Sequence, residues 1–298
     1  MATPLALRRR LLASLIIAPL VGVLPESAAE SQAPARPRLD IEAVTFNIRY
    51  LNRGEKGSNH WKHRKQLVIA AMREFKADIF GLQEALRPQL DDLSPALPGY
   101  SEFGVGRDDG KERGEYCAIL FRSERFSLDE DESGTFWLSD TPDKIGSMSW
   151  GNQITRICTW ARFIDRETKR SFYVYNTHWD HRSQESRVGA AKLILDRIAA
   201  RRYPDDPVIL MGDFNASKEN PAIQRLTRSL RDSLLLRHPD AADGRTFHGF
   251  KGGKSGRKID HIFVPSSTTV TGAAILYFQR DGAYPSDHYP VRAALQFR

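Results

Sequence analysis

The chain has 298 residues, of which 41% are hydrophobic, 10% aromatic and 27% charged, with only two cysteines. This composition predicts a buried core and excludes a disordered, collagen-like or disulfide-stapled protein. The formal net charge is +7, but residues 39–298 carry only +4 of it, which is a weak electrostatic signal for a nucleic-acid partner.

The first 30 residues predict an export signal. Arg8, Arg9 and Arg10 precede an apolar run at 11–24, and small residues follow it. This order is typical of a secretory signal peptide. The alternative is a membrane anchor, which needs about 18 or more apolar residues, so the run is short for one.

We therefore predict a cleaved signal peptide at 1–30, a disordered lead-in at 31–38 and one catalytic domain at 39–298. The mature protein is expected in the periplasm or outside the cell, without a transmembrane segment. Cys117 and Cys158 each lie inside an apolar run, so two buried free thiols are expected. A disulfide between them is the alternative in an oxidising compartment.

The elements of the domain follow from residue type and periodicity. Runs rich in β-branched and aromatic residues predict strands, and they occur at 41–47, 78–83, 116–122, 154–164, 172–177, 207–212, 259–264, 270–277 and 291–297. Helical stretches lie between them at 61–76, 185–202 and 219–230. In the second helix, an apolar stripe is expected from Val188, Ala191, Leu195 and Ile198. Residues 123–153 are expected to be mostly loop, and the mixture of elements predicts an α/β domain whose sheets are covered by helices.

Polar groups gather where these strands begin or end. They are Asn47, Glu84, His178, Asp213, Asn215, Asp260, His261 and the group Ser286, Asp287 and His288. Taken singly, each has an alternative explanation as a turn, a cap or a satisfied core side chain. Together they are typical of a scaffold that brings polar groups to one cleft.

Seven segments resemble the endonuclease/exonuclease/phosphatase superfamily. They are FNIRY (46–50), GLQEAL (81–86), GEYCAILFR (114–122), NTHWDH (176–181), MGDFNA (211–216), RKIDHIFV (257–264) and PSDHYPV (285–291). The resemblance implies a four-layer α/β sandwich, in which two mixed β-sheets pack face to face and are flanked by helices. It also implies hydrolysis of a phosphoester with the help of a divalent metal.

The resemblance assigns metal and water roles. Glu84 is the first expected ligand of Mg²⁺ or Mn²⁺, with Asn47 beside it and Asp287 as a further contributor. Asp213 matches the residue that holds the attacking water in line. Asn215 is expected to orient the same water or a phosphate oxygen if the strand is still extended there.

Two histidines complete the implied catalytic set. By analogy with the deoxyribonuclease pattern, His288 is expected to pair with Asp260 and His178 with Glu115. In each pair the carboxylate would fix the tautomer of the ring and raise its basicity.

Substrate contacts are predicted less directly. Arg156 matches a phosphate-contacting arginine, with a solvated strand-end charge as the alternative. Asp180 and His181 follow His178 and are candidates for metal or substrate contacts, with ordinary loop polarity as the alternative. The basic stretch at 251–258 is interpreted as the rim of an anion site or as a solvated loop. Candidates for stacking on a base or sugar are Trp137, Trp150, Trp179 and Phe247.

Departures from the family patterns reduce the number of substrate classes to consider. Arg49 stands where abasic-site enzymes have an acidic residue, so the metal geometry of those enzymes does not transfer directly. The segment at 257–260 lacks the signature of the inositol phosphatases. We predict a metal-dependent phosphodiesterase or nuclease. The alternatives are a phosphatase or phospholipase-type diesterase acting on a small or lipid-linked phosphoester, and a non-catalytic binding module. No stable protein partner is predicted.

Overall fold

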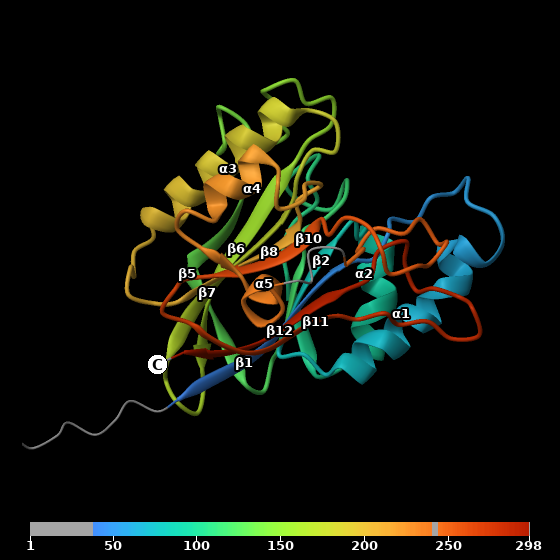
Figure 1. Cartoon of the computed structure of the whole chain (residues 1–298), viewed down its shortest axis with the longest axis horizontal. Helices are drawn as coiled ribbons and strands as arrows, with labels where there is room; N and C mark the ends of the chain where they lie inside the picture. The colour runs from blue at the N-terminus through green and yellow to red at the C-terminus, as the bar shows by residue number, and fades with distance from the viewer. Residues whose placement is uncertain (1–37, 240–243, 298) are drawn as a thin grey trace, which may run out of the picture. The chain divides into compact units, whose positions relative to one another are not determined.

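The structure is a computed structural model that describes residues 38–239 and 244–297. The predicted signal peptide at 1–30 and the lead-in up to residue 37 lie outside the described residues. Within them, Figure 1 shows two sheets with helices on their outer faces. None of the helices in the described ranges has the length and apolar character needed to cross a membrane.

The first sheet has six strands. In spatial order they are β11 (Thr269–Ile275), β12 (Val291–Phe297), β1 (Leu39–Asn47), β2 (Ile79–Gln83), β4 (Ile119–Arg122) and β3 (Tyr100–Phe103). Only β1 and β2 pair in parallel, and the other neighbours are antiparallel.

The second sheet is built in the same way. In spatial order it contains β5 (Phe126–Trp137), β6 (Ile157–Asp165), β7 (Ser171–His178), β8 (Val208–Asp213), β10 (Asp260–Val264) and β9 (Arg231–Asp232). Its parallel pair is β7 with β8. Each sheet is therefore mixed, as predicted.

Apolar side chains of both sheets fill the layer between them, where Ile79, Phe163 and Met211 belong to one buried cluster. A second cluster joins β7 and β8 to α3 (Gln184–Ala199) and α4 (Pro221–Leu226), which lie together over the second sheet in Figure 1. A third joins β1 and β2 to α1 (Trp61–Phe75) and α2 (Arg87–Leu93). The short α5 (Ser233–Arg237) contacts β10 and β11. The predicted four-layer α/β sandwich is confirmed.

Residues 123–153 are mostly loop, as predicted, but the stretch also contains β5 at Phe126–Trp137, which the sequence analysis did not predict. The strand carries a register shift between Asp129 and Ser133, and the acidic residues at that bulge interrupt its apolar alternation. The predicted stripe on α3 is also displaced. Ala191 and Ile198 are buried, but Val188 and Leu195 are only half-buried, and the remaining buried apolar positions are Ala190 and Ile194.

Cys117 and Cys158 are buried and both are free thiols. Cys117 lies between β3 and β4 in the sequence, and Cys158 lies in β6. Burial raises the pKa of the Cys117 thiol to about 12, so this thiol is neutral and unreactive at neutral pH.

Candidate active site

The two parallel strand pairs place four polar residues at neighbouring strand ends. Asn47 ends β1 beside Gln83 of β2, so Glu84 follows directly next to it. His178 ends β7 directly opposite Asp213, the last residue of β8. Parallel strands deliver their C-terminal residues to one edge of a sheet, and the two sheets bring both edges together. Asn47 Nδ2 spans the sheets by donating to Glu84 Oε1 and to Asp213 Oδ2, both at 3.0 Å.

Asp213 lies at the centre of the site and is 1% exposed. Besides the bond from Asn47, its Oδ2 lies 3.5 Å from His178 Nε2 and 3.7 Å from His288 Nε2. Its Oδ1 accepts the backbone N–H of Asn215 at 2.9 Å. Burial, together with the nearby charge of Asp260, raises the pKa of Asp213 to about 7. A carboxylate with such a pKa is suited to accept a proton near neutral pH.

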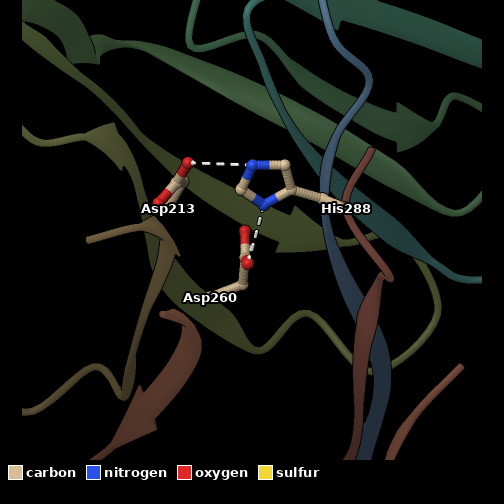
Figure 2. Close-up of side chains that lie close together, drawn as sticks. All are labelled: Asp213, Asp260 and His288. Carbon is tan, nitrogen blue, oxygen red and sulfur yellow. Dashed lines mark hydrogen bonds and ion pairs between the residues drawn. The ribbon is translucent and has the colours of Figure 1, made fainter. Parts of the chain in front are cut away.

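The His288 ring lies between two carboxylates, as Figure 2 shows. Nδ1 is 2.9 Å from Asp260 Oδ2, and Nε2 faces Asp213. Burial by itself lowers the pKa of His288, but the charges of Asp260 and Asp213 outweigh burial and raise the pKa to about 10. The ring is therefore an imidazolium at neutral pH.

His178 has the opposite protonation state. Burial, with the nearby charges of Arg156 and Arg107, holds the pKa of His178 well below its ordinary value, so the ring is neutral. The predicted pairing with Glu115 is not a hydrogen bond, because His178 Nδ1 and Glu115 Oε2 are 3.7 Å apart. Arg107 instead donates to both carboxylate oxygens of Glu115, at 2.6 Å and 2.9 Å.

Glu84, Asn47 and Asp287 offer oxygen donors where the sequence predicts a metal. Glu84 Oε2 accepts the backbone N–H of Tyr50 at 3.1 Å, and the backbone of Glu84 is left-handed, with φ 60°. Asp287 is 6% exposed, and burial raises its pKa, with the charge of Glu84 adding to the effect. A buried carboxylate whose charge is disfavoured by a second carboxylate nearby is stabilised by a cation between them.

Arg49 supplies part of that stabilising positive charge. Its Nη1 lies 3.7 Å from Glu84 Oε2, and its Nε lies 3.7 Å from Asp287 Oδ2. Its strongest contact is elsewhere, because Nη2 is 2.9 Å from Glu55 Oε1. The oxygen donors of this acidic pair therefore fit a hard divalent cation.

Asp213, Asp260 and His288 form a second set with metal-ligand character, since one ligand atom from each lies within 4.8 Å of the others. His288 Nδ1 is bonded to Asp260, however, and the protonated ring repels a cation. The hydrogen bonding therefore favours a proton-transfer unit at these three residues, and the Glu84 side is the better metal position.

Asn215 does not have the orientation that an extended strand would give it. Strand β8 ends at Asp213, and Asn215 is left-handed with φ 48°. Its Nδ2 donates to the carbonyl oxygen of Trp179 at 3.0 Å. The residue closes a turn that holds Asp213, through the backbone bond described above.

Arg156 precedes β6 and is 3% exposed. Its Nη2 lies 3.0 Å from His181 Nδ1, and its Nε lies 3.8 Å from Asp180 Oδ2. Nε and Nη1 are buried without a hydrogen-bond partner among the described residues. A buried guanidinium with two unsatisfied nitrogens is suited to receive an anion.

Asp180 acts mainly on the backbone. Its Oδ1 accepts the N–H groups of Arg182 at 2.8 Å and Ser183 at 2.6 Å, and so shapes the turn before α3. His181 is exposed as a residue. Partial desolvation of its ring, together with the charge of Arg156, lowers its pKa. Of the predicted aromatic candidates, Trp137 and Trp179 are core residues, Trp150 is half-buried, and Phe247 is 49% exposed with its ring 5.1 Å from that of His288.

Comparison with known proteins decides the family. The model of the Endonuclease/Exonuclease/phosphatase family matches residues 44–288. The chain belongs to this family. Enzymes of this family are phosphoester hydrolases or nucleases that use divalent metals. The oxygen donors around Glu84 are therefore consistent with the metal use of the family.

Solved structures of family members resemble the chain along most of its length. An endonuclease/exonuclease/phosphatase from Bacteroides vulgatus is 36% identical to this chain, with a TM-score of 0.80. The match covers 87% of this chain and 100% of the other chain. A mannosyl-6-phosphatase from Bacteroides thetaiotaomicron is 34% identical with a TM-score of 0.77, covering 86% and 99%.

In the curated relatives, the match to this chain covers a smaller share of the relative's own length. A probable RNA exonuclease of Saccharomyces cerevisiae is 24% identical over 67% of this chain and 42% of its own length. The chain spans between 22% and 59% of the length of the first curated relatives that it matches.

The sequence did not predict two arginines that act on the site residues, Arg107 and Arg64. Arg107 stands in a loop of mixed charge with nothing to distinguish it from its neighbours. Arg64 did leave a signal, because it falls on the buried face of α1 that contains Trp61 and Val68. Arg64 donates to the carbonyl oxygens of Ile48 and Pro285, and so ties the end of β1 to the segment that carries Asp287.

Proposed function

We propose that this protein hydrolyses a phosphoester bond, using Mg²⁺ or Mn²⁺ and a water held by Asp213. One observation carries the proposal. A single buried oxygen, Asp213 Oδ2, is reached by Asn47, by a neutral His178 and by a protonated His288. No packing role requires this convergence, whereas in-line attack on a phosphorus atom requires a base and an acid held in fixed places.

Asp213 is proposed as the group that takes the proton of the attacking water. Its raised pKa, about 7, makes it a stronger base than an ordinary carboxylate. His288 is proposed to donate hydrogen bonds or a proton to phosphoryl oxygens, because the ring is an imidazolium held by Asp260. His178, which is neutral, serves as a hydrogen-bond partner beside Asp213.

Glu84, Asn47 and Asp287 are proposed to hold the metal. A hard cation bound there supplies charge neutralisation to the phosphoryl group. Asn47 also bonds Asp213, so it links the metal ligands with the proton-accepting carboxylate.

For the substrate, two observations favour a small phosphoester over nucleic acid. The mannosyl-6-phosphatase resembles this chain at 34% identity and is covered to 99%, whereas the probable RNA exonuclease is 24% identical and covered to 42%. The charge of residues 39–298 is only +4, and nucleic-acid binding depends on many phosphate-neutralising cations. The nuclease activity that the family motifs predict remains the second candidate, because the curated relatives include exonucleases.

A substrate panel tests this choice. Purified protein with Mg²⁺ or Mn²⁺ is offered p-nitrophenyl phosphate, its bis-ester, mannose 6-phosphate, single-stranded RNA and duplex DNA. We expect the highest kcat/KM on a small phosphoester, with a shallow dependence on salt. Preference for RNA or DNA, with binding that weakens steeply as salt rises, would favour the nuclease.

The export signal is likewise proposed from residues 1–30. Expression of the full chain in a bacterial host, followed by fractionation and N-terminal sequencing, should give a protein outside the cytoplasm that begins near residue 31. Recovery of the uncleaved chain in the membrane would support the anchor instead.

A further inference from the structure

A cavity of about 400 Å³ opens beside the active site. One wall is formed by Gly151, Gln153 and Ile154, which precede β6, and the other by residues 180–183, which precede α3. Neither wall has a role in the proton transfers proposed above. Its volume is near the lower end of the range for ligand sites, which is about 300 to 1,000 Å³, so it suits a small ligand.

Arg156 connects this cavity to the catalytic residues. Its Nη2 contacts His181, a wall residue, and its charge is one of the causes that hold the pKa of His178 low. Its other two guanidinium nitrogens are buried and have no hydrogen-bond partner within the described chain, although Nε lies 3.8 Å from Asp180 Oδ2. A phosphate that satisfies Arg156 would therefore have its ester substituent beside the cavity.

The walls are fixed to each other by hydrogen bonds. Ser183 Oγ donates to the carbonyl oxygen of Trp150 and accepts the N–H of Ser186 in the first turn of α3. Arg182 Nη1 donates to Gln153 Oε1 at 3.3 Å across the cavity. These hydrogen bonds join the two walls, so a ligand would meet walls whose relative position is already fixed.

The lining identifies the chemistry of the ligand. It presents an amide from Gln153, a carboxylate from Asp180, an imidazole from His181 and a guanidinium from Arg182. Among the described residues that line the cavity, Ile154 has the only aliphatic side chain, and none is Phe, Tyr or Trp. Recognition of a nucleobase relies on aromatic stacking, whereas several donors and acceptors close together suit a group with many hydroxyls.

We propose that this cavity binds the hydroxyl-rich part of a sugar or polyol phosphate, with Gln153 and Arg182 as the residues that determine specificity. The proposal rests on the proposed function and adds where the group attached to the phosphate is bound. Both side chains are exposed, and within the described residues the Gln153 side chain hydrogen-bonds only to Arg182, so their replacement should leave the fold intact.

The experiment compares Gln153→Ala and Arg182→Ala with the wild-type protein. The measured quantity is the ratio of kcat/KM for mannose 6-phosphate to kcat/KM for p-nitrophenyl phosphate, which lacks sugar hydroxyls. We expect each variant to lower this ratio by roughly tenfold, the effect of about one lost hydrogen bond to a charged or polar group. Gln66→Ala, at an exposed position on α1, is the matched control and should leave the ratio unchanged.

Binding is measured independently of turnover. In an Asp213→Asn background, calorimetry should show that Gln153→Ala weakens mannose 6-phosphate binding by a similar factor. Hydrolysis of p-nitrophenyl phosphate by the wild-type protein, with no effect of either substitution on any sugar phosphate tested, would overturn the cavity proposal alone. Absence of hydrolysis of every phosphoester in the presence of metal would overturn the proposed function itself. A loss confined to RNA hydrolysis would overturn the assigned ligand class.

Discussion

His288 Nδ1 lies 2.9 Å from Asp260 Oδ2, and both side chains are buried beside Asp213. This contact, more than any other in the site, sets the protonation state of the ring. Without a carboxylate, burial would make His288 neutral, since burial is the largest influence on its pKa and lowers it. With Asp260 in place the ring is charged, and it faces Asp213 through its other nitrogen.

Replacing Asp260 with asparagine should therefore lower the pKa of His288. The amide preserves the shape of the carboxylate but removes the charge that stabilises the imidazolium. We expect kcat to fall by about 10² to 10⁴. The alkaline limb of the pH profile is expected near pH 10 in the wild-type protein, because the pKa of His288 is raised to about 10, and should move to lower pH in the variant. The measurement is kcat against pH. Asp196→Asn, at an exposed pair with Lys192, is the control and should leave the profile unchanged, and an unshifted limb in Asp260→Asn would show that His288 is not the titrating group.

Glu84→Gln should weaken metal binding. The substitution removes one of the two negative charges that face each other across Arg49, while the hydrogen bond from Asn47 can persist to the amide oxygen. We expect the Kd for Mg²⁺ or Mn²⁺, measured by calorimetry, to rise by roughly ten- to a hundredfold. Glu74→Gln, at the exposed end of α1, is a matched control with the same chemical change. Equal metal affinity in Glu84→Gln and wild-type protein would show that Glu84 is not a metal ligand.

Arg107→Met should raise the pKa of His178. Arg107 holds the Glu115 carboxylate with two hydrogen bonds, and its positive charge is one of the causes that lower the pKa of His178. Removing it takes away this repulsion and leaves Glu115 available to the ring. An NMR titration of the histidines should show the resonance of His178 titrating at higher pH than in the wild-type protein. Arg113→Met, an exposed arginine of the same loop, should leave that titration in place. No change in His178 would contradict the role of Arg107.

The sequence predicted the strand ends better than the contacts made there. Asn47, Glu84, His178 and Asp213 follow recognisable apolar strands. Parallel pairing within each sheet brings Asn47 beside Glu84 and His178 beside Asp213, and the packing of the two sheets brings the two pairs together. The partner of Glu115 could not be predicted, because Arg107 reaches it from a loop whose path depends on tertiary packing. The orientation of Asn215 was missed for a similar reason, since nothing in the residue pattern shows that β8 stops at Asp213.

For Lys258, the prediction from the basic composition of its segment is wrong. As part of the basic stretch at 251–258 it was expected at an anion site or in solvent, yet it is 4% exposed. Its Nζ lies 2.6 Å from Asp232 Oδ2 and 2.6 Å from His261 Nδ1. His261 Nε2 donates to the carbonyl oxygen of Ala216, so the network supports the turn that follows Asp213.

Asp232→Asn should accordingly destabilise the fold. It leaves the Lys258 ammonium buried without its anion, and losing one partner of a buried ion pair costs about 3–5 kcal/mol in the free energy of unfolding. The double variant Asp232→Asn/Lys258→Met removes both charges and keeps an acceptor for the backbone N–H of Leu234, so it should recover much of that loss. Denaturant unfolding measures both variants, with Asp196→Asn as an exposed control. A double variant as unstable as the single one would show that the pair itself, rather than the uncompensated charge, supplies the stability.

The same network predicts a pH dependence. Burial alone would raise the pKa of Asp232, but Lys258 and His261 outweigh burial and hold that pKa below its ordinary value. A carboxyl group of this kind stabilises the fold above its unfolded pKa, about 3.9, and the contribution is lost as the pH falls below that value. The stability difference between wild-type and Asp232→Asn protein should therefore shrink in acid.

The proposed hydrolysis depends on Asp213, which holds and deprotonates the attacking water. The most direct test of this role is hydrolysis of p-nitrophenyl phosphate and its bis-ester by Asp213→Asn, with metal binding measured in parallel. The amide keeps the size of the side chain and the acceptor for the backbone N–H of Asn215. We predict that kcat falls by about 10² to 10⁴, while metal binding and the unfolding transition are retained. Near-wild-type hydrolysis by the folded, metal-binding variant would contradict this role of Asp213.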